Sequence, residues 1–197
     1  MKVVLASKNP HKLVEIDAIT RQLGIELILQ SELGIDIDVE ETGTTFEENS
    51  FIKAEAVMKA TGLPAMADDS GLAVDALNGA PGVYSARYGG KDSDAARTAY
   101  LLENMADVPE AQRTARFVSA IACALPDGSV VTAEGYCEGT ITFETRGDNG
   151  FGYDPVFYVP SLGKTFAEAD GAEKNAISHR GNALNEFLKA WKETGLC

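Results

Sequence analysis

A long apolar stretch in the second half of the chain predicts two paired strands. Residues 114–125 and 129–143 carry apolar side chains at successive positions, and Asp127-Gly128 between them is typical of a two-residue hairpin turn. Strands that are apolar on both faces are typical of a sheet that is covered on both sides. The hairpin therefore predicts a central sheet with helices packed on its two faces.

Strand and helix patterns alternate along the rest of the chain. Further strands are expected at residues 2–6, 25–29, 35–39, 64–67 and 156–159. Helices are expected at residues 10–23, and at residues 46–60 after the capping box Thr45-Phe46-Glu47-Glu48. A third helix is expected to begin after a cap at Asp92 or Ser93 and to reach about Met105, and a last one to carry the apolar stripe Leu184, Phe187, Leu188 and Trp191. The chain has 197 residues without an internal repeat or an interdomain linker. We expect residues 1–197 to form a single α/β domain with a mixed sheet.

The composition is strongly acidic. The chain has 30 Asp and Glu residues against 17 Lys and Arg residues, and the net charge of −13 repels nucleic-acid phosphates and anionic lipids. No apolar run approaches the roughly 18–20 residues of a membrane span, and the apolar run Val3–Ala6 is too short for a signal peptide. We therefore expect a cytoplasmic protein that binds neither nucleic acid nor membranes. Three cysteines without a CxxC pair also predict no metal–thiolate site.

The first candidate site is Ser7-Lys8-Asn9-Pro10-His11-Lys12, where a strand is expected to lead into a helix N-terminus. Free backbone amides and the positive end of the helix dipole attract anions at such a place. Lys12 opposes that dipole, and a bound triphosphate would relieve the conflict. The segment predicts a phosphate site, although an ordinary solvated helix start explains the same residues.

The second candidate site is the carboxylate pair Asp68 and Asp69, which follows the expected strand at residues 64–67. Ser70-Gly71 are expected to bend the chain there. Two adjacent carboxylates repel each other unless a cation compensates them, and Mg²⁺ bridging to substrate phosphates would do so. An Asx-turn or a helix cap is the alternative. Adjacency leaves open which of the two carboxylates is a general base.

Three further groups have the chemistry of a binding site. Glu40-Glu41 and Lys53 lie on either side of the second helix start, although each is also typical of a solvated surface. The glycine-rich loop Phe151–Asp154 offers an aromatic ring for stacking. His179 and Arg180 place two planar donors at the start of the last helix, although a lone histidine is also often structural.

These motifs, in this order, resemble the Ham1/RdgB-type inosine triphosphate pyrophosphatases. Residues 7–12 match the family signature Ser/Thr-x-Asn-x-x-Lys, with Ser7 keeping the hydroxyl that threonine supplies in many members. The other matching motifs are Glu40-Glu41-Thr42-Gly43, Ala67-Asp68-Asp69-Ser70-Gly71-Leu72, Gly79-Ala80-Pro81-Gly82, Ser85-Ala86-Arg87-Tyr88, Phe151-Gly152-Tyr153-Asp154-Pro155 and Ser178-His179-Arg180-Gly181. The resemblance covers essentially the whole chain.

The resemblance implies a homodimeric, Mg²⁺-dependent enzyme. Its fold would be an elongated mixed sheet flanked by helices, with two lobes and a central cleft. It would hydrolyse the deaminated purine nucleoside triphosphates ITP, dITP and XTP to the nucleoside monophosphate and pyrophosphate. Such an activity would clear these nucleotides from the nucleotide pool.

The resemblance also implies a role for each matching residue. The phosphates would be held by Ser7, Lys8, Asn9, Pro10, His11 and Lys12, supported by Lys53, while Ser70 would touch the substrate. The metal would be held by Glu41 and Asp69, and Asp69 beside Asp68 would also be the general base. The base pocket would be lined by Phe151, Gly152, Tyr153, Asp154, Lys174, His179 and Arg180, with His179 and Arg180 donating to the purine 6-oxygen.

Two other functions are open from the sequence. Asp36-Ile37-Asp38-Val39 could be the DxD motif of an aspartyl-phosphate phosphohydrolase, which works through a covalent intermediate. Gln30-Ser31-Glu32 interrupts the continuous apolar strand that should lead into such a motif. A non-catalytic nucleotide-binding module is the second alternative, and tight nucleotide binding without turnover in Mg²⁺ would distinguish it.

Overall fold

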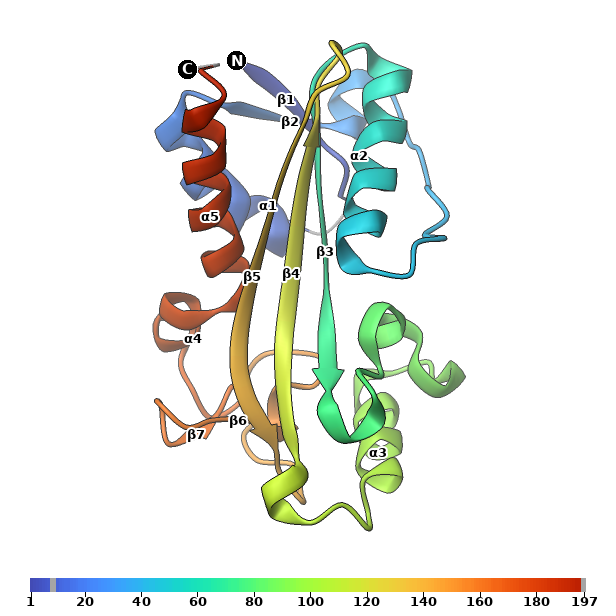
Figure 1. The fold of residues 1–197 in the computed structure, drawn as a ribbon, viewed down its shortest axis with the longest axis vertical. Helices are drawn as coiled ribbons and strands as arrows, with labels where there is room; N and C mark the ends of the chain where they lie inside the picture. The colour runs from blue at the N-terminus through green and yellow to red at the C-terminus, as the bar shows by residue number, and fades with distance from the viewer. Residues whose placement is uncertain (8–9, 196–197) are drawn as a thin grey trace. The chain divides into compact units, whose positions relative to one another are not determined.

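A mixed sheet carries the fold of the described chain (Figure 1). The computed structural model describes residues 1–7 and 10–195, without the side chains of Pro10, His11, Val14, Glu15 and Ala18. Its strands are β1 (Lys2–Leu5), β2 (Glu26–Leu29), β3 (Ala65–Val74), β4 (Thr114–Ala124), β5 (Val130–Ile141), β6 (Phe157–Val159) and β7 (Lys164–Thr165). They are ordered β2-β1-β3-β4-β5-β6-β7. β1 is parallel to β2 and β3, whereas β6 is antiparallel to β5 and β7, which confirms the predicted mixed α/β fold.

The helices lie between and after these strands. They are α1 (Pro10–Thr20), α2 (Phe46–Thr61), α3 (Asp94–Asn104), α4 (Gly171–Ile177) and α5 (His179–Glu193). None of the helices within the described residues is both long enough and apolar enough to span a membrane.

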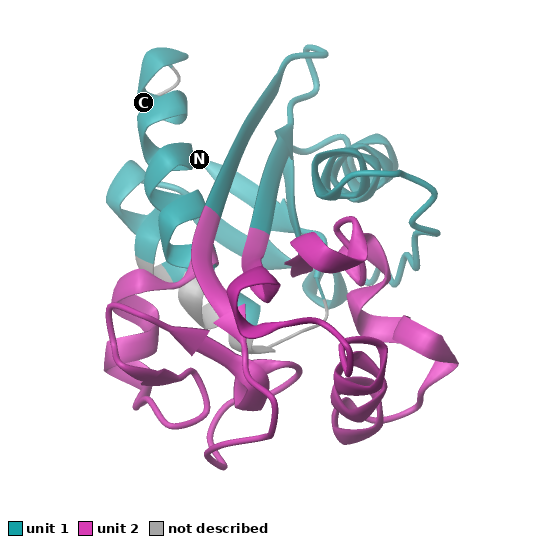
Figure 2. Cartoon of the chain, turned by 60° about the horizontal axis from the view of Figure 1, so that its bottom comes forward, with its two compact units in different colours: residues 1–70, 119–135, 180–197 teal, residues 71–118, 136–179 magenta. Residues whose placement is uncertain are grey.

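The chain divides into two compact units (Figure 2). Unit 1 comprises Met1–Ser70, Ser119–Gly135 and Arg180–Cys197, and unit 2 comprises Gly71–Val118 and Tyr136–His179. The boundaries between the units fall within β3, β4 and β5 and after the first residue of α5. The predicted cleft between two lobes stays a prediction.

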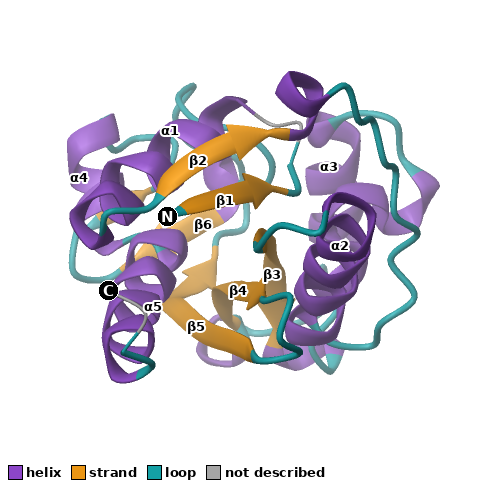
Figure 3. Cartoon of the chain, turned by 90° about the horizontal axis from the view of Figure 1, so that it is seen from above, coloured by secondary structure: helices purple, strands orange, loops and turns teal. Residues whose placement is uncertain are grey.

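In unit 1, successive side chains of the strands face different helices. The larger residues Met66, Ile121 and Cys123 belong to a buried cluster with Ile16 of α1 and Phe187 of α5. The intervening alanines, Ala67, Ala122 and Ala124, cluster instead with Ala54 of α2. Figure 3 shows α5 and α2 on opposite sides of β3 and β4. Side chains alternate along a strand, so the residues of β3 in unit 1 point to two faces in turn. One face packs against α1 and α5, and the other packs against α2.

The two helix starts with the clearest sequence signals form as predicted. Thr45 accepts the N–H of Glu48 at 3.1 Å, while the Glu48 carboxylate accepts the N–H of Thr45 at 3.3 Å. Ser93 accepts the N–H of Ala96 at 3.2 Å and begins α3. The reciprocal bonds of α2 and the single bond of α3 satisfy backbone donors that a helix start leaves open.

The predicted strand at residues 35–39 is wrong, because this segment is irregular. The N–H of Ile37 donates to the side-chain oxygen of Gln30 at 3.1 Å. Ile37 packs against the buried cluster of Val4, Val57 and Ala65. The alternation of apolar and acidic residues therefore reflects one half-buried side of an irregular segment.

The predicted bend at Ser70-Gly71 is also wrong. β3 continues as one extended strand from Ala65 through Asp68, Asp69, Ser70 and Gly71 to Val74. Leu72 and Val74 are fully buried in the apolar cluster of unit 2, and an extended backbone brings them there. A Ser-Gly pair permits that extended backbone as readily as a turn.

The strands of the long hairpin differ from each other in burial. β4 is buried on both faces as predicted, but β5 alternates between buried and exposed residues. The sequence analysis also missed β7 and α4. β7 has two residues and too little pattern to recognise, whereas α4 begins with a capping box of Asp170 and Glu173 that the sequence displays.

The described cysteines are buried free thiols. Burial raises the pKa of Cys123 to about 12. Burial, with a smaller contribution from Glu138, raises the pKa of Cys137 to about 11. Cys197 lies outside the described residues. Both thiols therefore stay protonated near neutral pH and behave as small apolar side chains.

Candidate functional site

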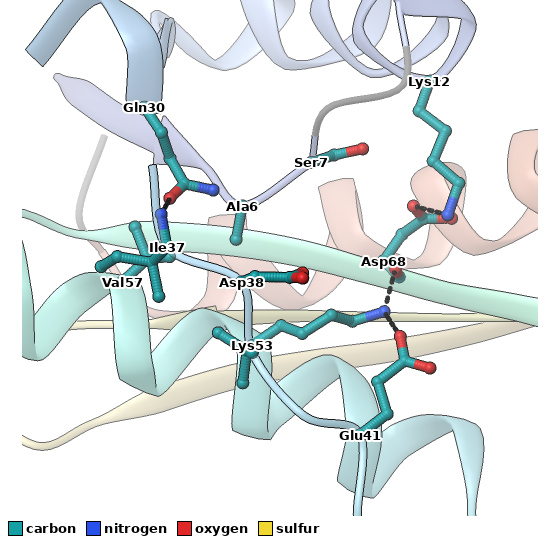
Figure 4. A pocket seen from close by; sticks show the side chains of 11 residues that line it. Ala6, Ser7, Lys12, Gln30, Ile37, Asp38, Glu41, Lys53, Val57 and Asp68 are labelled. Atoms are coloured by element: carbon teal, nitrogen blue, oxygen red, sulfur yellow. Dashed lines mark hydrogen bonds and ion pairs between the residues drawn. The ribbon is translucent and has the colours of Figure 1, made fainter. Parts of the chain in front are cut away.

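A cavity of about 240 Å³ in unit 1 collects charged side chains from separate parts of the chain (Figure 4). It is lined by Ala6, Ser7, Lys12, Gln30, Ile37, Asp38, Val39, Glu41, Lys53, Val57 and Asp68. Five of these residues, Ser7, Lys12, Glu41, Lys53 and Asp68, are ones to which the family resemblance gives a role, and Asp38 belongs to the DxD motif of the alternative. The fold therefore brings both ends of the predicted phosphate segment, Glu41 of the acidic pair before α2 and the first aspartate of β3 to one cavity.

On one face of β3, Asp68 is held between two cations. The Asp68 Oδ1 lies 2.7 Å from the Nζ of Lys12 in α1. The Nε of Arg180 in α5 donates to the Asp68 Oδ2 at 3.2 Å. Asp68 follows Met66 by two residues and so shares its face of the strand, which is the face that α1 and α5 cover.

The Asp68 side chain is 0% exposed. Burial alone would raise its pKa, but Lys12 and Arg180 outweigh burial and hold the pKa of Asp68 well below its usual value. Asp68 is therefore a fixed anion that orients two cations.

On the opposite face of β3, Asp69 meets residues from α2 and from the segment before it. The Nζ of Lys53 donates to the Asp69 Oδ1 at 3.1 Å and to the Glu41 Oε1 at 2.7 Å. It also donates to the backbone oxygen of Asp68 at 3.1 Å. The two adjacent aspartates of β3 are thus separated by the alternation of the strand and have different principal partners.

Burial and nearby charges shift the pKa values of Asp69 and Lys53. Burial, together with the charge of Glu41, raises the pKa of Asp69 above its usual value even though Lys53 opposes the shift. Burial would lower the pKa of Lys53, but Asp69 and Glu41 outweigh it and raise the pKa. The Lys53 ammonium therefore stays charged between two carboxylates at neutral pH.

The Glu41 and Asp69 carboxylates fit the requirements of a divalent ion such as Mg²⁺. Both lie within hydrogen-bond distance of one ammonium nitrogen, so they already converge on one positive charge. Among the residues that the structure describes, no three His, Cys, Asp or Glu side chains form a group that could hold a metal ion. Mg²⁺ is usually held by one or two carboxylates, with water and substrate phosphates as its other ligands. A pair of carboxylates is therefore a sufficient protein contribution.

In unit 2, the glycine-rich loop forms a second candidate site around Lys174. The Nζ of Lys174 lies 2.5 Å from the Asp154 Oδ2 and 4.6 Å from the centre of the Phe151 ring. The same Asp154 oxygen accepts the N–H of Phe151 at 2.9 Å. Phe151 is 58% exposed, so part of its ring is accessible to a ligand. Gly152 is held by Asp94, which accepts its N–H at 2.8 Å.

Two predicted pocket residues of unit 2 are part of its packed interior. The His179 ring stacks on Phe117 with 5.0 Å between the ring centres, and His179 is buried. The hydroxyl of Tyr153, also buried, donates to the backbone oxygen of Ser85 at 2.8 Å. These contacts give both side chains a structural role, while their predicted contact with a base stays a prediction.

The remaining predicted residues are accounted for as follows. Ser70 accepts a hydrogen bond of 3.4 Å from Arg180, and Ser7 lines the cavity of unit 1. Lys8 and Asn9 lie outside the described residues, as do the side chains of Pro10 and His11.

Asn49 is a site residue that the sequence analysis missed. It is 0% exposed, and its Nδ2 donates to the Asp69 Oδ2 at 3.3 Å. The available signal was a polar residue at an inward-facing position of α2, where Ala54 and Val57 also point into the protein. A buried polar side chain needs a partner, and that requirement points to another polar group nearby.

Known proteins resemble this chain over nearly its whole length. The Ham1 family model matches residues 3–190. A Thermus thermophilus protein named dITP/XTP pyrophosphatase is 52% identical over 193 residues, which cover 98% of this chain and 93% of that protein. The structure of a Ham1 protein from Coxiella burnetii is 48% identical with a TM-score of 0.91, covering 98% of this chain and 99% of the other. The Ham1 protein from Staphylococcus aureus is 45% identical with a TM-score of 0.90, covering 99% of this chain and 100% of the other. With sequence and fold in agreement over nearly its full length, the chain belongs to the Ham1 family.

Proposed function

We propose that this protein hydrolyses the deaminated purine nucleoside triphosphates dITP, XTP and ITP to nucleoside monophosphates and pyrophosphate. The observation that carries the proposal is the pair of charged groups on opposite faces of β3, Lys12–Asp68–Arg180 and Lys53–Asp69–Glu41. In a chain with a net charge of −13, the Lys12–Asp68–Arg180 group has one positive charge in excess, which favours a polyanionic substrate. The Lys53–Asp69–Glu41 group has one negative charge in excess, which a divalent ion would offset. The names of relatives that are about half identical over nearly the whole chain support the substrate class.

Lys12 and Lys53 are the proposed phosphate-binding residues. Both ammonium groups line the unit 1 cavity and are ion-paired to carboxylates there. Negative charge grows on the phosphate oxygens in the transition state, and fixed cations stabilise it. The anchored Asp68 keeps Lys12 in place, so little reorganisation is needed when substrate binds.

Glu41 and Asp69 are the proposed ligands of Mg²⁺. When bound, Mg²⁺ supplies positive charge that neutralises the phosphate oxygens. We propose Mg²⁺ as the metal. Hydrolysis measured with Mg²⁺ alone and with Mn²⁺ alone decides between the two ions.

Asp69 rather than Asp68 is the proposed general base that takes a proton from the attacking water. The Asp68 side chain is 0% exposed, whereas the Asp69 side chain is 11% exposed. A base must come within hydrogen-bond reach of the proton that it removes. Asp68 is enclosed by its two cations, which leaves Asp69 as the carboxylate with access to water.

The glycine-rich loop of unit 2 is the proposed base-binding element. Phe151 offers an exposed ring face, and Lys174 places a charged donor 4.6 Å from the ring centre. His179 and Arg180 remain proposed donors to the purine. We also propose that the enzyme is a homodimer, as the family resemblance implies, and that it is cytoplasmic, as expected from the sequence.

The proposed function is tested by identifying which phosphorus water attacks. The purified protein is incubated with ITP and Mg²⁺ in water enriched in heavy oxygen, and orthophosphate and pyrophosphate are measured separately. We expect intact pyrophosphate and heavy oxygen in the monophosphate, because a triphosphate held at several points leaves its α-phosphorus beside the carboxylates. Release of labelled orthophosphate, or a phosphoryl group covalently bound to an aspartate of the chain, would instead support the aspartyl-phosphate alternative.

The metal assignment is tested by Lys53→Met. The substitution leaves Glu41 and Asp69 without the cation between them, and loss of one partner of a buried ion pair costs on the order of 3 kcal/mol. Mg²⁺ would restore the missing charge, so we expect Mg²⁺ to raise the melting temperature of Lys53→Met more than that of the wild type. Thermal unfolding with and without Mg²⁺ measures this difference.

Lys59→Met is the matched control for that experiment. Lys59 lies in the same helix and pairs with Glu55, but its side chain is 65% exposed. Its variant should respond to Mg²⁺ as the wild type does. An equal Mg²⁺ response in Lys53→Met and Lys59→Met would contradict the proposed ligands.

A further inference from the structure

Asn49 connects two parts of the unit 1 site through a buried amide. Its Nδ2 donates to the Asp69 Oδ2 at 3.3 Å, and its Oδ1 accepts the N–H of Gly43 at 2.8 Å. The backbone N–H of Gly43 can only donate and an ionised carboxylate can only accept. A side chain between them must therefore present both an acceptor and a donor, as an amide does.

Asn49 and Lys53 hold the two oxygens of Asp69 separately. The residues are four positions apart in α2 and so lie on the same face of the helix. Lys53 binds the Oδ1 of Asp69 and Asn49 binds the Oδ2. One donor would leave the carboxylate free to rotate about its Cβ–Cγ bond, whereas two donors on one rigid helix define its plane.

Asn49 also anchors the segment that carries Glu41. Gly43 lies two residues after Glu41, and a Cβ atom at Gly43 would lie 2.7 Å from the Asn49 Oδ1. The neighbouring N–H of Thr44 donates to Glu48 at 2.6 Å, which fastens the same segment to the start of α2. Asn49 thus has hydrogen bonds to one proposed metal ligand and to the segment that bears the other.

The geometry points to Asn49 as a positioning residue that orients Asp69 and the Glu41 segment for metal binding and proton transfer. This inference rests on the proposed function, because it acts on the residues to which that function assigns these tasks. Asn49 acts through Asp69 and Gly43. Residues that orient metal ligands in this way typically change metal affinity or activity by about 10- to 100-fold when they are lost.

The inference is tested by kinetics of Asn49→Ala and Asn49→Leu, with Ser50→Ala as the matched control. Ser50 is also 0% exposed in the same turn of α2, but its hydroxyl donates to the backbone oxygen of Glu47 at 2.9 Å. We expect kcat for ITP to fall about 10- to 100-fold in both Asn49 variants, with KM within about threefold of the wild type. Ser50→Ala should keep kcat within about threefold. Asn49→Leu fills most of the amide volume and serves if Asn49→Ala does not fold.

A second measurement does not depend on turnover. Mn²⁺ has ligand preferences close to those of Mg²⁺, and its binding without nucleotide is measured by calorimetry. We expect Mn²⁺ to bind about tenfold or more weakly to the folded Asn49 variants than to Ser50→Ala. Equal kcat and equal Mn²⁺ affinity across these variants would overturn the inference and leave the proposed function intact.

Failure of the proposed function has a different signature. If the wild type hydrolyses none of ITP, dITP and XTP, that function is contradicted, and the Mn²⁺ affinities decide the inference alone. A wild type that neither hydrolyses these nucleotides nor binds Mn²⁺ overturns both.

Discussion

Asp69→Asn is expected to lower turnover of ITP by about 100-fold or more, the scale of losing a positioned proton acceptor. The change removes the proposed base and weakens a proposed metal ligand at once, without changing the size of the side chain. Lys53 keeps its 2.7 Å bond to Glu41, so the second charged group retains an ion pair. The fold should therefore survive, as circular dichroism and the melting temperature would report.

Asp38→Asn is the informative comparison for Asp69→Asn. Asp38 lines the same cavity and belongs to the DxD sequence of the aspartyl-phosphate alternative. We expect kcat to fall less than about tenfold in Asp38→Asn, because the proposed reaction has no covalent intermediate. Near-normal kcat in Asp69→Asn with loss of activity in Asp38→Asn would reverse the assignment.

ITP and XTP are expected to be hydrolysed roughly tenfold to 10⁴-fold more efficiently than ATP. Lysine and arginine side chains only donate, so they can pair with a purine 6-oxygen but not with the 6-amino group of adenine. Each buried group left unpaired costs about 1–3 kcal/mol, and one or two such groups give this range. The measurement is kcat/KM for ITP, XTP and ATP, and equal values for ITP and ATP would refute donor-based selection. GTP also carries a 6-oxygen, so its poor use is expected from the family resemblance alone.

Two variants test which residue stacks on the purine ring and which one recognises its 6-oxygen. Phe151→Ala should lower kcat/KM for ITP and ATP by the same factor, because every purine has a face on which an aromatic ring can stack. Arg180→Ala distinguishes two roles for a residue whose contacts include Asp68 and Ser70. A larger fall for ITP than for ATP assigns Arg180 to the base. An equal fall assigns it to the Asp68 group and leaves Lys174 as the donor in unit 2.

Local signals in the sequence were sufficient for much of the fold. The capping box of Thr45 and Glu48 predicted the start of α2, and the strand–turn–strand pattern around Asp127-Gly128 predicted the hairpin of β4 and β5. These features depend on residues a few positions apart, so they are readable from one sequence. The strand predicted at residues 35–39 was wrong, because alternating apolar residues do not by themselves supply a neighbouring strand for backbone hydrogen bonds.

The sequence by itself determined which kinds of residue form the candidate site, but only the tertiary structure decided how they are grouped. In the sequence, Asp68 and Asp69 form one acidic pair. In the structure, they lie on opposite faces of the continuous strand β3, where Asp68 contacts Lys12 and Asp69 contacts Lys53. The contact of Asn49 with the site was also visible only in the structure, because its partner Asp69 is 20 positions away in the chain. Helix caps and turns are set by neighbouring residues, whereas the partners of a buried charge are set by which helix covers which face of the sheet.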